Sequence, residues 1–193
     1  MDTESIFKSV PELYTKNYLL RGLIVDDAAE LFLFMQDTET MKYITPTPVK
    51  SERAMKEEVQ RQLEKYELQK EIPWVILNKE NGELIGKFSY HKLHMWHRKA
   101  EMGVVIRKEY QRSGVMTEIM PEVLRFGFQT LNLNRIVGDI FAENRGSERL
   151  LEKHGFIKEG VLRQTDFDGE RYHDTVVFSL LKPEYEGQRI ELK

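Results

Sequence analysis

The chain has 193 residues, of which 40% are hydrophobic and 32% are charged, and its formal net charge is −3. This length favours one domain with an adequate hydrophobic core, so we expect residues 1–193 to form a single domain. A protein that binds nucleic acid by neutralising phosphates usually carries a basic excess, so the charge disfavours that role. The absence of cysteine excludes disulfides, thiolate zinc sites and a cysteine acyl-enzyme.

No hydrophobic run approaches the roughly 20 residues of a membrane span. The first ten residues, MDTESIFKSV, lack the basic and apolar regions of a secretory signal. Together these features predict a cytoplasmic protein without membrane contact.

The N-terminal third predicts one strand and two helices. Residues 17–24 have the pattern of a strand, and residues 26–37 that of an amphipathic helix that opens with two aspartates. Residues 51–70 predict a polar helix capped by Ser51, with Glu and Lys pairs along its surface.

The middle of the chain changes to the two-residue period of strands. Residues 72–93 predict two strands joined at Asn81–Gly82, a strong hairpin signal, and residues 100–107 predict a third strand. Apolar residues then recur at helical spacing from Met116 to Leu131. Pro121 lies inside this helix and should remove one of its backbone hydrogen bonds.

The last third predicts a strand, a helix and an antiparallel strand pair, at residues 135–142, 144–155, 156–167 and 171–181. Asn144 is a suitable N-cap for the helix, Gly155 a suitable C′ residue, and Asp168–Gly169 a suitable turn between the paired strands. The chain therefore predicts a mixed α/β (α+β) fold with a largely antiparallel sheet.

The segment that follows Ile106 predicts an anion site. A strand ends there, and a short turn leads into a helix whose first residues include Gly114. The first amides of a helix have no partners within it, the helix dipole favours negative charge beside them, and glycine permits close approach of a phosphate. Arg112 and Ser113 add a cation and a hydroxyl. Neither G-x-x-x-x-G-K-[ST] nor G-x-G-x-x-G occurs, which removes support for a nucleotide triphosphatase or a dinucleotide enzyme.

Residues 111–116, QRSGVM, resemble the [RQ]-x-x-G-x-[GA] pyrophosphate loop of the GNAT N-acetyltransferase superfamily. The resemblance extends from about Leu13 to Pro183 and is greatest to the ribosomal-protein-alanine and -serine N-acetyltransferases. The N-x-x-S-x-x-[LAV]-x-x-x-x-G-F signature of that branch is matched by Asn144, Ser147, Leu150, Gly155 and Phe156. Met116 departs from the usual glycine or alanine, and its side chain would narrow the pyrophosphate site.

The resemblance implies a GNAT fold, with a mixed, mostly antiparallel sheet of about seven strands and about four flanking helices. It also implies acetyl-CoA as cosubstrate, without a metal, and acetyl transfer to a primary amine. The backbone of Val104, Val105 and Ile106 should pair with the pantetheine arm, as an added strand would. The residues implied to hold the rest of the cofactor are Gln111, Arg112, Ser113, Gly114, Val115, Met116 and Asn144.

The acceptor is expected to be the N-terminal α-amine of a protein, such as a ribosomal protein. Without cysteine, the amine should attack the thioester directly, and it must be neutral to do so. At about pH 7.4 roughly a fifth of an α-amine is neutral, against about 0.1% of a lysine. A small amine (a polyamine or an aminoglycoside) and a non-catalytic acyl-CoA sensor remain alternatives. The segments expected to face the acceptor are residues 36–55 and 163–172, and the protein is expected to be a monomer or homodimer.

Five residues are candidates for catalysis or acceptor binding. Related enzymes place a serine at the position of Ser147, which is implied to protonate the leaving thiol; a serine that only stabilises the helix start is the alternative. Asp166 falls where the ribosomal branch carries an acidic candidate base, and Glu101 is its rival, acting through a water. Tyr172 and His173 could line the acceptor side.

A histidine repeat and Trp74 are two further features of the sequence that do not belong to these candidates. His91, His94 and His97 recur every three residues, which alternates faces on a strand, and no carboxylate pattern joins them, so we expect no metal site there. Trp74 is most simply a core residue.

Overall fold

The computed structural model of the protein describes residues 6–45, 47–168 and 170–191. Within this part of the chain, eight strands form one sheet in the order β1-β2-β3-β4-β5-β6-β8-β7. The strands are β1 (Leu13–Tyr14), β2 (Tyr18–Gly22), β3 (Ile72–Asn78), β4 (Leu84–His94), β5 (Lys99–Ile106), β6 (Arg135–Phe141), β7 (Ile157–Phe167) and β8 (Tyr172–Leu181). Neighbouring strands are antiparallel except β5 and β6. The predicted mixed, mostly antiparallel sheet is confirmed, and the extra strand is the two-residue β1.

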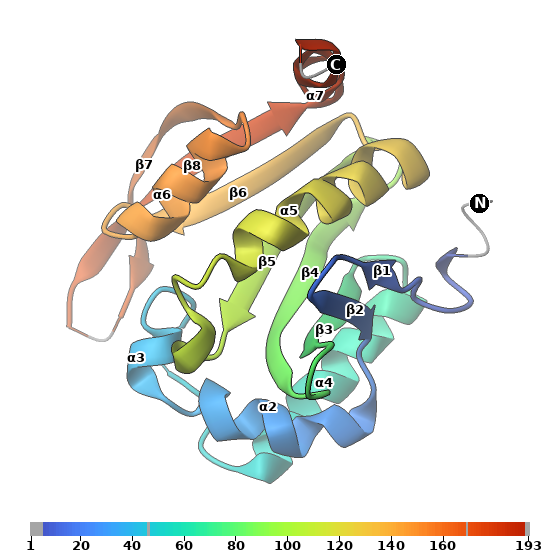
Figure 1. Ribbon diagram of the computed structural model, residues 1–193. Helices are drawn as coiled ribbons and strands as arrows, with labels where there is room; N and C mark the ends of the chain where they lie inside the picture. Colours follow the sequence, from blue (N-terminus) through green and yellow to red (C-terminus); the bar gives the residue numbers. More distant parts are fainter. Residues whose placement is uncertain (1–5, 46, 169, 192–193) are drawn as a thin grey trace.

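Helices cover both faces of the sheet (Figure 1). Their bounds are α2 (Ala28–Met35), α3 (Thr38–Met41), α4 (Glu52–Glu67), α5 (Val115–Arg125), α6 (Arg145–Lys153) and α7 (Lys182–Glu191). Because side chains alternate between the two faces of a strand, the sheet separates two hydrophobic clusters. The larger cluster lies against α5 and α6 and includes Trp74, Phe88 and Phe178, whereas the smaller one lies against α2 and α4 and includes Val75 and Val105. Trp74 is therefore a core residue, as expected.

The first predicted helix divides into a 3₁₀ turn (Val25–Asp27) and α2. The buried Asp27 carboxylate explains the division, because it binds residues that precede it in the chain and does not cap α2. It accepts a hydrogen bond from the Ile24 amide at 2.9 Å and two from Arg21 at 2.6 and 2.8 Å. The predicted cap of α4 is confirmed, since the Ser51 hydroxyl accepts the Ala54 amide at 3.1 Å.

The predicted hairpin and the long helix both form, with one difference. Gly82 has φ +74°, the left-handed conformation that a tight turn requires, and so confirms the turn between β3 and β4. Helix α5 runs through Pro121, which lies on its exposed side. At Arg125 the helix gives way to a π-helical turn, Phe126–Thr130, so the predicted helix to Leu131 is a composite.

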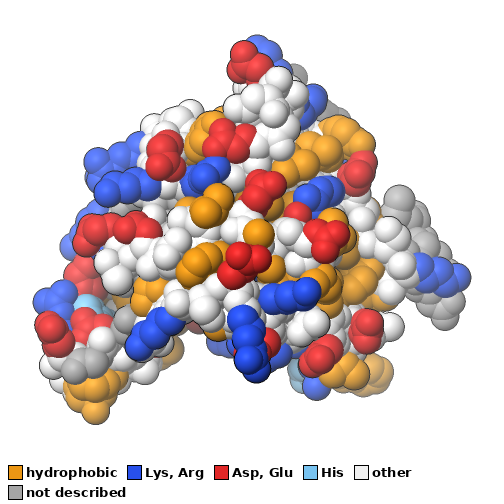
Figure 2. All heavy atoms as spheres, turned by 90° about the horizontal axis from the view of Figure 1, so that it is seen from below, with side chains coloured by type: hydrophobic (Ala, Val, Ile, Leu, Met, Phe, Trp, Pro, Cys, Tyr) orange, Lys and Arg blue, Asp and Glu red, His pale blue; other side chains and the backbone are white. Residues whose placement is uncertain are grey.

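The surface of the molecule carries charges of both signs. Seen from below, Lys and Arg side chains alternate with Asp and Glu, with hydrophobic side chains between them (Figure 2). None of the helices in the described ranges is both long and apolar enough to span a bilayer.

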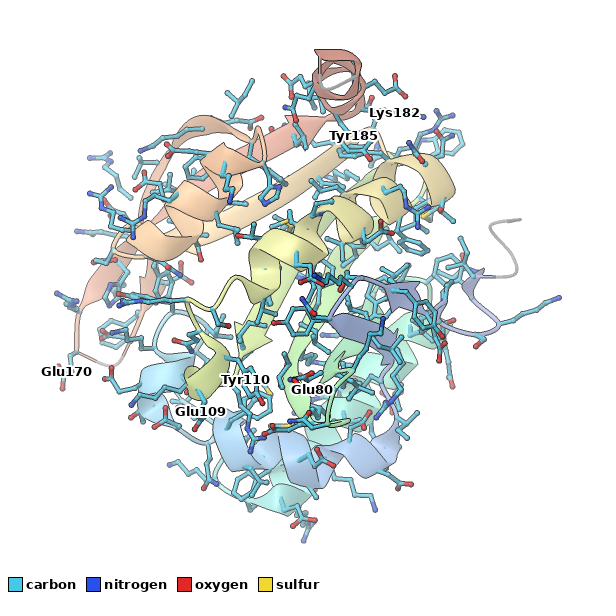
Figure 3. The ribbon with its side chains drawn as sticks, in the orientation of Figure 1. Glu80, Glu109, Tyr110, Glu170, Lys182 and Tyr185 are labelled. Atoms are coloured by element: carbon cyan, nitrogen blue, oxygen red, sulfur yellow. The ribbon has the colours of Figure 1, made fainter. Side chains whose placement is uncertain are left out.

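The C-terminal region contains one helix that the sequence did not predict. Asn144 caps α6 through the Ser147 amide, and Gly155 has φ +79°, so both predicted ends of α6 are confirmed. The turn predicted at Asp168–Gly169 lies partly outside the described residues, because Gly169 is not among them. Helix α7 extends beyond Pro183, and its Tyr185 ring stacks on Phe128 with 4.8 Å between centroids (Figure 3).

Candidate active site

The parallel strands β5 and β6 separate after a short stretch of pairing. Their registered partners are Lys99 with Arg135, Ala100 with Ile136, and Glu101 with Val137. Strand β5 nevertheless continues to Ile106, paired on its other side with β4, while β6 turns away (Figure 1). From Met102 to Ile106, the edge of β5 that faces β6 thus has no strand partner among the described residues. An extended ligand can hydrogen-bond to such an edge as an added strand.

Helices α5 and α6 begin beside this open edge. Each follows the carboxyl end of one of the two parallel strands, and each packs against the same hydrophobic cluster, so both start at the same end of the sheet (Figure 1). Glu118 fixes α5 there, because its carboxylate accepts hydrogen bonds from Thr15 and from the Asn17 amide, both at 2.6 Å. Two helix N-termini with their positive dipole ends therefore flank the gap between β5 and β6.

The turn into α5 presents a run of free amides. Gly114 is the N-cap residue with φ +89° and ψ 0°, and the first amide that bonds back to it is that of Glu118, at 3.1 Å to the Gly114 carbonyl. The amides of residues 112–117 donate no hydrogen bond to any described residue. A Cβ built on Gly114 would meet nothing within 4 Å. This combination of free donors, helix dipole and open space suits a phosphate group.

The side chains of the loop have divided roles. Arg112 is exposed and has no ion-pair partner in the described part of the chain, so its charge is available to an anion. The Ser113 hydroxyl instead donates to the Tyr110 carbonyl at 2.6 Å, and Gln111 Nε2 donates to the Ile106 carbonyl at 2.9 Å. Gln111 occupies the Ile106 carbonyl, and the Val105 carbonyl lies against Gly86 of β4, so Val104 retains the freest backbone of the three predicted contact residues.

Tyr110 anchors the loop from below (Figure 3). Its hydroxyl donates to Glu83 at 2.6 Å, and Glu83 also pairs with Arg107 at the end of β5. Met116, the departure from the family pattern, is partly buried and packs against the larger hydrophobic cluster. The Met116 side chain is thus accommodated by the core, while its amide stays free.

Asn144 and Ser147 lie in the first turn of α6, beside the gap. The Asn144 side-chain oxygen accepts the Ser147 amide at 3.1 Å, so Asn144 acts as the predicted cap. The Ser147 hydroxyl is partly buried and forms no hydrogen bond with a described residue. It therefore remains able to donate to a bound group.

Three carboxylates gather on the opposite side of the gap from α6. Glu101 is the last β5 residue paired to β6, and its carboxylate lies 2.7 Å from Lys92 Nζ. Asp139, two residues beyond Glu101's partner, lies on the same face of the sheet. Partial burial raises the pKa of Asp139, the nearby charges of Glu101 and Asp166 add to the rise, and Lys92 opposes it. The two candidate bases, Glu101 and Asp166, therefore lie near each other. Asp139 is a third carboxylate, which the sequence did not predict.

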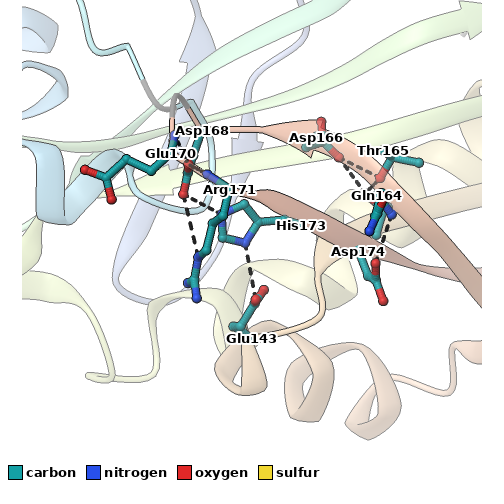
Figure 4. Close-up of polar contacts among 10 residues, drawn as sticks. Glu143, Gln164, Thr165, Asp166, Asp168, Glu170, Arg171, His173 and Asp174 are labelled. Atoms are coloured by element: carbon teal, nitrogen blue, oxygen red, sulfur yellow. Dashed lines mark hydrogen bonds and ion pairs between the residues drawn. The ribbon is translucent and has the colours of Figure 1, made fainter.

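Asp166 is held by hydroxyl groups. Its Oδ2 accepts hydrogen bonds from Thr175 at 2.7 Å and from Thr165 at 2.9 Å (Figure 4). These bonds orient the carboxylate and satisfy one of its oxygens, which leaves it less available as a proton acceptor than Glu101.

Comparison with known proteins decides the family. Residues 17–157 match the model of the acetyltransferase (GNAT) domain. The chain is also 35% identical over 173 residues to YoaA, an uncharacterized N-acetyltransferase of Bacillus subtilis (strain 168). The match covers 90% of this chain and 98% of YoaA. The chain belongs to the GNAT family of acetyltransferases.

Two further GNAT proteins differ in their acceptors. The ribosomal-protein-serine acetyltransferase of Escherichia coli (strain K12) is 26% identical over 100 residues, 52% of this chain and 56% of that protein. The crystal structure of spermidine N-acetyltransferase from Vibrio cholerae in complex with CoA and spermine is 25% identical, with a TM-score of 0.80, and the match covers 88% of this chain and 98% of that chain. Both the sequence and the fold thus support the GNAT assignment, and the acceptor is left to the chemistry of this chain.

This GNAT chain contains a pocket of about 520 Å³ between α4 and the sheet. The segment that follows α3 and one side of α4 form its walls, so the first predicted acceptor segment, residues 36–55, lines it. The β7–β8 hairpin, the second predicted segment, does not. The floor is formed by Lys87, Ser89, His91, Gly103, Val104 and Val105. The pocket therefore reaches the part of β5 that has no strand partner on the side of β6 in the described ranges.

His173 is engaged in the hairpin instead of free to bind an acceptor. Its side chain is only 8% exposed, and its ring nitrogens lie 2.5 Å from Asp168 and 3.2 Å from Glu143 (Figure 4). Asp168, and then Glu143, raise the pKa of His173 despite its burial, while His173 lowers the pKa of Asp168. Tyr172 is 62% exposed and contacts Phe167 at the hairpin tip. His173 is thus a structural residue in this geometry.

A pH-dependent contribution to stability should follow from His173. Since the folded protein raises its pKa, its stabilising effect is complete below the unfolded value of about 6.5 and is lost as the pH rises through the folded value. We expect His173→Gln to lower the melting temperature most between about pH 5 and pH 6.5, with the deficit shrinking toward pH 9. Thermal unfolding of both proteins across this range checks it. The exposed His97→Gln is the control, and a deficit that does not vary with pH would contradict the assignment.

The three histidines of the repeat have different neighbours. The His94 and His97 rings lie 4.2 Å apart between centroids, whereas the His91 imidazole lies 3.6 Å from Glu101. No group of three or more His, Asp or Glu side chains in the described ranges is arranged to hold a metal ion. Burial lowers the pKa of His91, against the opposing effect of Glu101.

Proposed function

We propose that this GNAT acetyltransferase transfers the acetyl group of acetyl-CoA directly to the N-terminal α-amine of a protein. The carrying observation is the unpaired edge of β5, flanked by the N-termini of α5 and α6 on one side and by an acceptor pocket on the other. An acyl donor and an amine that approach from opposite faces would meet at this edge. The arrangement favours an enzyme over a sensor, which would need no acceptor pocket.

The residues around Gly114 fit the diphosphate of coenzyme A. The amides of residues 112–117 have no acceptor among the described residues, Arg112 is an unpaired cation, and the space beyond Gly114 is open. We infer that the same amides, with Val104 and Val105 along the pantetheine arm and Asn144 near the gap, hold the cofactor. Bound there, acetyl-CoA supplies the activated acyl group.

The charges of the pocket favour a protein N-terminus over a polyamine. A polyamine carries several positive charges and is expected to need a site with an excess of carboxylates. This pocket is instead lined by three cations, Arg61, Lys65 and Lys87, and by two carboxylates, Glu58 and Glu71. The acceptor named for the Vibrio cholerae relative is therefore not supported for this chain, whereas an amine at the end of a peptide is.

The chain's own groups would manage orientation and protons. Hydrogen bonds along the β5 edge would orient the reacting carbonyl, and such positioning provides a large part of rate enhancement. Glu101, at the point where β5 and β6 separate, would accept the proton of the incoming amine directly or through a water. Ser147, whose hydroxyl has no partner among the described residues, would donate a proton to the leaving thiolate.

We expect Ser147→Ala to lower kcat about tenfold and to leave acetyl-CoA affinity within about threefold. The effect is below the usual 10²–10⁴ of general acid catalysis, since a thiol with a pKa of about 8.5 is already a good leaving group. The backbone amide that Asn144 caps is retained in the variant. Steady-state kinetics and calorimetry of CoA binding measure the two quantities, with the exposed Ser9→Ala as a control. Unchanged turnover would remove Ser147 from the mechanism.

The function itself is tested by release of free thiol from acetyl-CoA with three acceptor panels. We expect turnover with short peptides that have a free N-terminus, and none with the same peptides after N-terminal blocking. Preferential turnover of spermidine or of an aminoglycoside would replace the proposed acceptor. Acetyl-CoA binding without turnover of any amine would identify a sensor instead.

A further inference from the structure

We propose that the pocket on the acceptor side binds an acidic side chain of the substrate peptide, with Lys87 as its ion-pair partner. This inference rests on the proposed function, because it names the class of N-terminus that the enzyme acetylates. It concerns recognition of a second group, several residues away from the amine that reacts.

Lys87 is a half-buried cation near the carboxylates of Glu71 and Glu58. It lies on β4, between Val75 of β3 and Val105 of β5, and its side chain forms part of the pocket floor. Its ammonium forms neither an ion pair nor a hydrogen bond with any described residue. Burial lowers the pKa of Lys87 to about 8, against the opposing effects of Glu71 and Glu58. A partly desolvated ammonium without a hydrogen-bond acceptor is costly, and an anionic ligand would relieve that cost.

The other charges of the pocket are largely satisfied within it. Arg61 pairs with Glu58 at 2.6 Å, and Lys65 lies 3.9 Å from Glu71, which is only 4% exposed. Glu71 is also near Lys87, so the pocket holds three cations against two carboxylates, an excess of one positive charge. The pocket should therefore prefer a side chain with one negative charge to a neutral or positive one.

Gln62 supplies a second, independent observation that points to a ligand in this pocket. Its side chain is 8% exposed, lines the pocket, and donates through Nε2 to Glu58 at 3.0 Å. Its carbonyl oxygen, in contrast, is buried and has no donor within the described residues. Buried acceptors are normally satisfied, and a backbone N–H of a bound peptide is a suitable donor. A peptide with an acidic side chain would satisfy both Gln62 and Lys87.

The length of the pocket limits where the acidic residue can lie. His91, near Glu101 and the proposed position of the amine, is four residues along β4 from Lys87, or about 13 Å on an extended strand. An extended peptide covers about 3.3–3.6 Å per residue. Allowing for the lengths of the two side chains that meet, we place the acidic residue at the second, third or fourth position of the substrate.

The experiment compares peptides that differ by one charge. Alanine-based peptides with a free N-terminus carry Glu, Gln or Lys at position two, three or four, and kcat/KM is measured for each. We expect one of these positions to show at least a tenfold preference for Glu over Gln, with Lys least favoured. The preference should fall to about twofold or less in Lys87→Met, with kcat on the Gln peptide changed little.

Two controls separate recognition from loss of structure. Lys56→Gln removes an exposed lysine from α4 and should keep the full preference for Glu. Lys87→Met removes one of the two cations near the buried Glu71, which can destabilise the fold, so Lys87→Met combined with Glu71→Gln provides a charge-balanced second variant. Unchanged CoA affinity by calorimetry shows that the cofactor side remains intact in each variant.

The possible results test this inference separately from the proposed N-terminal acetylation. Equal use of Glu and Gln peptides by the wild type, or a preference that persists without Lys87, would overturn the inference and leave N-terminal acetylation standing. Turnover of polyamines with no turnover of any free N-terminus would overturn both. The proposal is supported if both variants that lack Lys87 lose the preference for Glu but still turn over the Gln peptide, while Lys56→Gln keeps the preference.

Discussion

Replacement of Gly114 by valine is expected to raise the dissociation constant of coenzyme A about 100-fold, which is about 2.7 kcal/mol. Two effects combine. Gly114 has φ +89°, a left-handed conformation that costs a side-chain-bearing residue about 1–2 kcal/mol and a β-branched one more. A Cβ at this position would also project into the open space where the diphosphate is proposed to lie. Calorimetric titration with coenzyme A measures the change.

Gly82 provides a matched control for this experiment. It has φ +74°, and a Cβ there also meets nothing within 4 Å, but it lies in the turn between β3 and β4. Gly82→Val should therefore cause similar backbone strain and a similar loss of thermal stability, with CoA affinity unchanged. If Gly114→Val binds coenzyme A as tightly as the wild type, or if both variants lose affinity equally, the turn into α5 is not the diphosphate site.

The features predicted correctly from the sequence were those that short-range chemistry determines. Asn81–Gly82 forms its turn, Ser51 and Asn144 cap their helices, and Gly155 adopts the left-handed conformation that ends α6. Each depends on a few neighbouring residues, so a single sequence contains the necessary information. The start of α5 after Gly114 belongs to the same class, because a helix start is a local feature.

The parts that escaped prediction depend on contacts between distant segments. Strands β5 and β6 pair only as far as Glu101 and Val137, and the hydrophobic pattern of neither strand shows where this pairing ends. Asp139 looked like an ordinary strand residue, and its raised pKa arises only when Glu101 and Asp166 are brought near it. Helix α7 has few apolar residues, and what orders it includes the stacking of Tyr185 on Phe128.

The pocket proposed to bind the acceptor is the extreme case of this dependence. Lys87 and Gln62 have nothing in the sequence to mark them, since one lies in a strand and the other in a polar helix. Only the packing of α4 over β4 turns them into a half-buried cation and a buried acceptor in one pocket. His173 shows the reverse, because its apparent availability in the sequence disappears when Asp168 and Glu143 enclose its ring.

Glu101→Gln is expected to lower kcat/KM about 100-fold near pH 7, within the usual range for loss of a general base. Glu101 lies where β5 and β6 separate, and its paired Lys92 is mostly exposed, so the substitution leaves no buried charge behind. The deficit should narrow to less than about tenfold near pH 9, because an α-amine with a pKa near 8 is then mostly neutral without help. Rate profiles over this pH range, with a peptide acceptor, test the prediction.

Asp166→Asn is the matched comparison for the assignment of the base. Because Thr165 and Thr175 already occupy one of its oxygens, we expect the Asp166 variant to lose less than about threefold in kcat/KM at any pH. A large, pH-dependent loss in Asp166→Asn together with a small one in Glu101→Gln would exchange the two roles. A deficit in Glu101→Gln that stays constant with pH would mean that the carboxylate orients the amine through its charge and does not accept its proton, since proton acceptance is the step that a rising pH makes unnecessary.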